Sequence, residues 1–172
     1  MLVERRIRSY QAPLHQYLCG GGKRAIEIAH RRWGKDEIAL AWTFQALTDR
    51  PATYWHCLPQ LNQARKAIWT AVNPHTGKRR IDEAFPVELR EVTNEHEMFI
   101  RFKNQSTWQV IGSDTYDSLV GAGVAGIVFS EWALANPSAW GYLSPMMREN
   151  NGWALFITTP RGKNHAYDMF NH

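Results

Sequence analysis

The stretch AHRRWGKD at residues 29–36 decides how the rest of this sequence is interpreted. It follows the frame G-x-x-x-x-G-K-[ST], in which the backbone N–H groups of a loop surround phosphate oxygens and a lysine neutralises their charge. Gly34 and Lys35 stand where the frame requires them, whereas Ala29 replaces its first glycine and Asp36 replaces its serine or threonine. The stretch therefore predicts a phosphate-binding loop whose metal-binding position is altered.

The segments on both sides of this loop have the patterns that phosphate binding requires. Residues 25–29 predict a short strand, and residues 35–47 predict a helix that is apolar on most sides. Residues 53–58, rich in β-branched and aromatic side chains, predict a second and buried strand. In such a βαβ unit the helix N-terminus points at the bound anion. This context favours phosphate binding over an ordinary basic turn, although a Gly-Lys pair by itself would not.

The remaining patterns predict one α/β domain. With 172 residues and 44% hydrophobic content, the chain can bury a single core. We expect a P-loop NTPase fold, a three-layer sandwich with a mostly parallel central sheet, formed by residues 1–172 as one domain. The further predicted elements are a helix over residues 60–72, a hairpin of residues 98–103 and 107–112, buried parallel strands at residues 124–129 and 153–158, and a helix over residues 137–149.

Composition narrows the class of protein. Two cysteines, Cys19 and Cys57, are too few for a disulfide framework and favour a reducing compartment. No stretch approaches the roughly 20 apolar residues that span a bilayer, so we expect a cytosolic protein without membrane contact. Basic residues crowd residues 1–35, which suits a polyanion such as nucleotide phosphate or nucleic acid. A solvated charged face explains the arginines at residues 5–8 equally well.

Asp36 is the departure that most affects the chemistry. A carboxylate ~4 Å from a phosphate oxygen is repelled by ~4 kcal/mol at an effective dielectric constant of 20. An intervening Mg²⁺ would reverse that sign. Arg31 and Arg32 could offset the charge or stabilise the transferred phosphoryl group, the alternative being that one of them is merely exposed. We therefore expect ATP and Mg²⁺ as the ligands of this loop.

A second acidic motif, GIVFSE at residues 126–131, follows a buried strand. Ser130 stands where an aspartate is usual, and Glu131 stands where a glutamate that activates water is usual. Taken by itself, Glu131 could equally begin a helix. Because one carboxylate is lost at Ser130 and one is gained at Asp36, the acidic charge around a metal is unchanged. This exchange predicts a swapped ligand set of Asp36, Ser130 and Glu131.

A third polar segment, TTPRGKNH at residues 158–165, follows the last predicted strand. In an open α/β sheet the carboxyl ends of the strands face the ligand. Thr158 or Thr159 is thus placed to sense the γ-phosphate, while Arg161 and Lys163 would face phosphate or DNA. The alternative is a tight Pro-Gly turn with solvated charges.

Together, these motifs resemble the large terminase subunit of tailed bacteriophages, specifically its N-terminal ATPase portion, over nearly the whole chain. The resemblance rests on Tyr10-Gln11, HRRWGK at residues 30–35, SE at residues 130–131 and the segment at residues 158–165. It implies that Gln11 reads adenine, that Glu131 activates water, and that Thr158 and Thr159 couple hydrolysis to movement. In the loop it assigns phosphate contacts to Arg31, Arg32 and Lys35. The other loop residues that we expect at the nucleotide are His30, Trp33, Gly34 and Asp36.

The resemblance also implies a function, an ATPase that drives double-stranded DNA into a procapsid in the host bacterial cytoplasm. Its implied partners are DNA, a small terminase subunit and a portal protein, and it allows a homo-oligomeric ring. Two departures weaken it: SLVG at residues 118–121 lacks the arginine that many relatives carry before the glycine, and no nuclease domain follows in this chain. A catalytically impaired nucleotide-binding remnant of a prophage gene and a helicase-like module are the alternatives.

Overall fold

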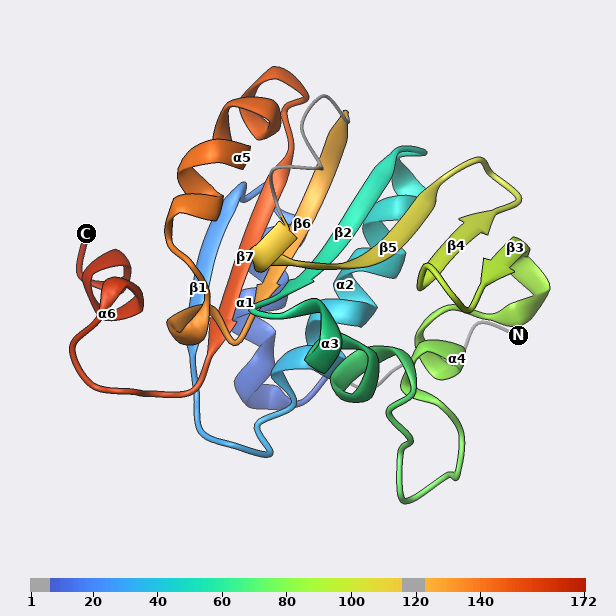
Figure 1. Ribbon diagram of the computed structural model, residues 1–172, viewed down its shortest axis with the longest axis horizontal. Coiled ribbons are helices and arrows are strands. Elements are labelled where there is room, and N and C mark those ends of the chain that lie inside the picture. Colours follow the sequence, from blue (N-terminus) through green and yellow to red (C-terminus); the bar gives the residue numbers. More distant parts are fainter. Residues whose placement is uncertain (1–6, 116–122) are drawn as a thin grey trace.

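The computed structural model describes residues 7–115 and 123–172 and shows an α/β sandwich (Figure 1). Within these residues, seven strands form one sheet in the order β1-β7-β6-β2-β5-β4-β3. The five strands from β1 to β5 in this order are mutually parallel, and β4 and β3 add an antiparallel edge. The strands are β1 (Arg24–Ile28), β2 (Thr53–Leu58), β3 (Arg90–Asn94), β4 (Phe99–Phe102), β5 (Thr107–Gly112), β6 (Val124–Ser130) and β7 (Trp153–Thr158). The predicted fold class is confirmed.

Helices cover both faces of the sheet and make the other two layers. One face carries α1 (Ala12–Cys19) and α2 (Lys35–Asp49), and the opposite face carries α5 (Ser138–Glu149) and α6 (His165–Phe170) (Figure 1). No helix within the described ranges is long and apolar enough to cross a membrane.

Neighbouring strand residues pack into two separate cores because successive side chains of a strand point to opposite faces. Tyr54 packs in the core under α2, while Trp55 packs in the core under α5. Val128 and Ile127 of β6 divide in the same way. This double burial explains why the central strands lack the alternation of apolar and polar residues that a half-exposed strand shows.

The segment between β2 and β5 differs most from the sequence-based prediction. The single helix expected over residues 60–72 is a short α3 (Leu61–Ala64) that continues as a π-helical turn, Arg65–Trp69. Trp69 at the end of this turn stacks on Trp108 of β5, with ring centroids 6.2 Å apart. The expected hairpin is confirmed, since β4 and β5 pair antiparallel.

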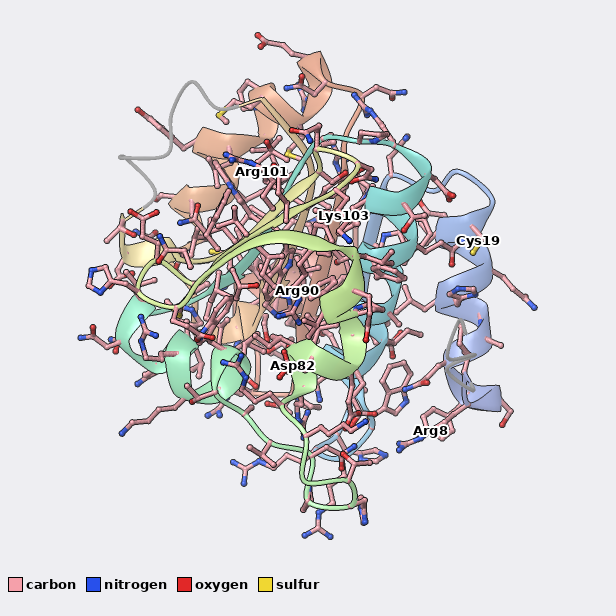
Figure 2. All side chains as sticks on the ribbon, turned by 90° about the vertical axis from the view of Figure 1, so that its right-hand side faces the viewer. Arg8, Cys19, Asp82, Arg90, Arg101 and Lys103 are labelled. Carbon is pink, nitrogen blue, oxygen red and sulfur yellow. The ribbon has the colours of Figure 1, made fainter. Side chains whose placement is uncertain are left out.

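Strand β3 and α4 (Arg80–Ala84) were not predicted, and they are held together by a buried cation. Arg90 donates from Nη2 to Oδ1 of Asp82 at 2.9 Å and also to the carbonyls of Ile81 and Phe85. Asp82 and Arg90 lie close together on this side of the molecule (Figure 2). Since these contacts join residues of different elements, no local sequence pattern predicts them.

Candidate nucleotide-binding site

The residues after β1 form a loop that closes around a lysine. Nζ of Lys35 donates to the carbonyl oxygens of Ala29 and His30, each at 2.9 Å. Gly34 precedes α2 with a φ of 86°, which is the left-handed region that glycine adopts without steric cost. The loop therefore delivers an ammonium group and a helix N-terminus to the same place, and both favour an anion.

The N-terminal segment is fastened to this loop by Gln11. Its Nε2 donates to the carbonyl oxygens of Trp33 at 3.0 Å and Gly34 at 3.4 Å, and its Oε1 accepts from the backbone N–H of Arg8 at 3.2 Å. The side chain is 5% exposed. A Cβ atom on Gly34 would lie 2.8 Å from Nε2 of Gln11, so a larger residue would displace the end of the Gln11 side chain. Gln11 thus braces the backbone of the loop between β1 and α2.

The other loop side chains divide between the surface and the core. His30, Arg31 and Arg32 are exposed, which leaves both arginines accessible to an anion at the loop. Trp33 is buried, and its ring centroid lies 5.4 Å from that of Tyr10.

Asp36 and Ser130, the two departures from the usual motifs, meet in space. The hydroxyl of Ser130 donates to Oδ1 of Asp36 at 2.7 Å, and Nε2 of His56 lies 3.2 Å from the same oxygen. Burial by itself raises the pKa of Asp36, but hydrogen bonds from His56 and Ser130 and the electrostatic attraction of His56 and Arg80 outweigh it. The net pKa of Asp36 is therefore below its usual value, and the carboxylate is ionised at neutral pH.

The oxygens of Asp36 and Ser130 fit a magnesium ion. Mg²⁺ prefers oxygen ligands, retains several waters and is held in nucleotide sites by one or two carboxylates together with phosphate oxygens. Among residues 7–115 and 123–172, no group of three or more His, Cys, Asp or Glu side chains is arranged to hold a metal. A metal at this site would accordingly draw most of its ligands from phosphate and water.

Glu131 and Thr158 end two neighbouring strands at the same edge of the sheet. Glu131 follows β6 with a φ of 53°, an unusual conformation for a residue with a side chain, and it is half-buried. Oγ1 of Thr158 accepts from the backbone N–H of Ala133 at 3.2 Å and donates to the carbonyl of Thr159 at 3.2 Å. Thr158 therefore connects the end of β7 to the turn that follows Glu131.

The topology gathers these groups although they are far apart in sequence. Strand β7 lies between β1 and β6, so the carboxyl ends of the loop strand, the threonine strand and the acidic strand adjoin one another. Of the segments singled out in the sequence, SLVG at residues 118–121 and the arginines at positions 5 and 6 lie outside the described residues.

His56 is a polar contact of this site that the sequence did not indicate as functional. It is fully buried in the middle of β2. The available signal was a single imidazole within the apolar run TYWHCL at residues 53–58.

The fold has close counterparts among solved structures. The large terminase ATPase domain of Thermus phage P74-26 superposes with a TM-score of 0.77 at 22% identity, over 98% of this chain and 71% of that one. The N-terminal domain of the DNA packaging ATPase from bacteriophage phi29 superposes with a TM-score of 0.63 at 13% identity, over 91% of this chain and 84% of that one. The fold is that of a large terminase ATPase domain.

Sequence comparison also finds large terminase subunits. The large terminase subunits of Thermus phage G20c and Thermus virus P23-45 are each 28% identical over 163 residues, which is 86% of this chain. The chain spans 33% of the length of these large terminase subunits. No family model matches the sequence. The resemblance to the large terminase that the motifs indicated is confirmed, and the fold that matches is that of the ATPase domain.

Proposed function

We propose that this chain binds ATP with Mg²⁺ and hydrolyses it as the ATPase domain of a DNA-packaging motor, with residues 1–172 acting as one domain. The observation that carries the proposal is the 2.7 Å hydrogen bond between Ser130 and Asp36. Two substitutions that each look damaging in sequence form one hydroxyl–carboxylate pair in the fold. A chain that had lost its function would not be expected to retain this complementarity.

The loop supplies the phosphate contacts. Phosphate oxygens carry formal charge and are stronger acceptors than the carbonyls of Ala29 and His30, so Lys35 would exchange those carbonyls for the β- and γ-phosphates. Backbone N–H groups near Gly34 complete the cradle. The exposed Arg31 and Arg32 would neutralise charge on the transferring phosphoryl group.

The acidic edge supplies the chemistry. When bound, Mg²⁺ would be held by Asp36 with Ser130 and Glu131 nearby, and it neutralises charge on the phosphates. Glu131 would orient a water whose oxygen attacks the γ-phosphorus, breaking the bond to the ADP oxygen. Thr158 and Thr159 would relay the loss of the γ-phosphate, because Thr158 already contacts the turn after Glu131.

The nucleotide itself is suggested by a relative. The large terminase of a thermophilic bacteriophage, solved in complex with ATP-γ-S, superposes with a TM-score of 0.68 at 13% identity over 91% of this chain and 39% of that one. For the present chain, Gln11, His30 and Trp33 would lie on the nucleoside side of the loop. Double-stranded DNA, a small terminase subunit, a portal protein and a ring of copies are the partners that this function requires.

Calorimetric titration with ATP-γ-S, with and without Mg²⁺, tests the proposal. We expect the wild-type chain to bind, Lys35→Ala to lose binding, and Lys103→Ala, which removes an exposed lysine on the far antiparallel edge, to bind as wild type. Figure 2 marks Lys103 on that side. A folded wild-type chain that binds no nucleotide would contradict the proposal and favour the impaired remnant.

A further inference from the structure

His56 occupies a place where an apolar residue would be expected. Its side chain is fully buried in β2, which runs between β6 and β5, and its ring packs 6.3 Å from that of Trp108. Burying an imidazole costs free energy unless its nitrogens are hydrogen-bonded. Nδ1 is buried without a hydrogen-bond partner within the described part of the chain. Among the described residues, the hydrogen bond that offsets this cost is therefore the contact of Nε2 with Asp36.

The geometry selects one of the two neutral tautomers of His56. With hydrogen on Nε2, the ring donates to Oδ1 of Asp36, and Nδ1 is left as an acceptor. With hydrogen on Nδ1, a buried N–H would lack an acceptor, and the lone pair of Nε2 would face the carboxylate. The Nε2–H tautomer is thus the one that fits.

Both hydrogen bonds to Asp36 converge on the same oxygen. His56 and Ser130 approach Oδ1 from two different strands, β2 and β6, which are neighbours in the sheet. A carboxylate held by two donors at one oxygen cannot rotate freely, and it presents its second oxygen, Oδ2, in a fixed direction. In metal sites, such outer partners orient the ligands that contact the ion.

We propose that His56 is a positioning residue for the metal site: its Nε2–H fixes the carboxylate of Asp36, the residue that would hold Mg²⁺. The inference rests on the proposed function, because it assumes that Asp36 serves a metal–nucleotide complex. It assigns His56 no contact with the nucleotide, so its loss changes metal affinity and leaves metal-free nucleotide binding unchanged.

Two matched variants test this role. The Nε2 atom of glutamine can take the place of the histidine Nε2–H, whereas the amide of asparagine reaches only the position of Nδ1, which faces away from Asp36. We expect His56→Asn to raise the Mn²⁺ concentration that half-saturates the ATP-γ-S complex, measured by electron paramagnetic resonance, by about tenfold or more. His56→Gln should stay within about threefold of wild type, since it retains the donor. Equal effects of the two variants would overturn the proposal.

A spectroscopic measurement keeps the inference testable if His56→Asn does not fold. Long-range ¹H–¹⁵N spectra of the wild-type chain should show His56 protonated at Nε2 and unprotonated at Nδ1. The opposite tautomer would overturn the proposal. If the wild-type chain binds no ATP-γ-S, the proposed function fails. If it binds and His56→Asn shows unchanged metal dependence, only the role of His56 fails.

Discussion

The hydroxyl of Ser130 donates a 2.7 Å hydrogen bond to Oδ1 of Asp36, although 94 residues separate the two along the chain. Each of these residues departs from the motif in which it stands, one in the phosphate-binding loop and one in the acidic strand. In the fold, the carboxylate and the hydroxyl of an ordinary metal-binding pair have exchanged places. The site therefore keeps one carboxylate and one hydroxyl joined by a hydrogen bond. The carboxylate now comes from the loop and the hydroxyl from the strand.

Exchanging the two residues back should preserve the site. Asp36→Ser alone removes the carboxylate and is expected to weaken Mg²⁺-dependent binding of ATP-γ-S at least about tenfold, which is about 1.4 kcal/mol. Ser130→Asp alone sets two carboxylates side by side, and their repulsion should lower the melting temperature. The double variant should recover most of both losses in titrations at several Mg²⁺ concentrations. Losses that simply add in the double variant would refute the exchanged pair.

Glu131→Gln should separate binding from hydrolysis. The amide cannot accept a proton from the attacking water, so phosphate release from ATP should fall at least about 100-fold. Binding of ATP-γ-S should change by less than about threefold, since the phosphate contacts come from the loop. The matched control is Glu149→Gln, an exposed carboxylate at the end of α5, which should hydrolyse ATP as wild type. Normal turnover by Glu131→Gln would show that Glu131 does not activate the attacking water.

Gly34→Ala should destabilise the chain more than Gly77→Ala does. Both glycines have a positive φ, 86° and 71°, so alanine is strained at either position by roughly 1 kcal/mol. Only at Gly34 would the new Cβ meet another group, Nε2 of Gln11 at 2.8 Å, whereas Gly77 has open space around it. Urea unfolding measures both changes in the free energy of unfolding. Equal losses would show that Gln11 yields to the methyl group without cost.

Gln11→Ala should cost about 1–2 kcal/mol of folding stability, because the buried carbonyl of Trp33 loses the donor that Gln11 supplies. The comparison is Gln63→Ala on α3, where the glutamine is exposed and alanine favours the helix. The melting temperatures of both variants check this prediction: Gln11→Ala should melt lower than wild type, and Gln63→Ala should not. An unchanged melting temperature for Gln11→Ala would mean that the loop holds its conformation without this side chain.

Glu27→Gln should raise stability at neutral pH. Burial raises the pKa of Glu27, with Lys35 partly opposing the shift, so the folded state disfavours the ionised carboxylate. The charged group thus destabilises the fold fully above the raised folded-state pKa, and this penalty disappears as pH falls from there to below the pKa of the unfolded chain. The variant should therefore melt higher than wild type at pH 7.5, with the advantage shrinking towards pH 4. An advantage independent of pH would have another cause.

The sequence by itself determined the local structures of this protein. The frame at residues 29–36, the strands around it and the hairpin of β4 and β5 follow from residue type and periodicity, which act over a few neighbouring positions. The large terminase resemblance could be drawn for the same reason, since its motifs are short and contiguous. Elements without such patterns, β3 and α4, went unpredicted because contacts of Arg90 with groups of another element stabilise them.

Only the tertiary structure decided how the candidate site is assembled. Sequence could suggest that Asp36 compensates for Ser130, but the 2.7 Å contact depends on β7 lying between β1 and β6 and on the packing of α2 against the sheet. His56 escaped notice because a lone polar residue in a buried strand has no neighbours in sequence that reveal its partner. Hydrogen bonds act over about 3 Å, and distances of that order between remote residues are set only when the chain packs into its layers.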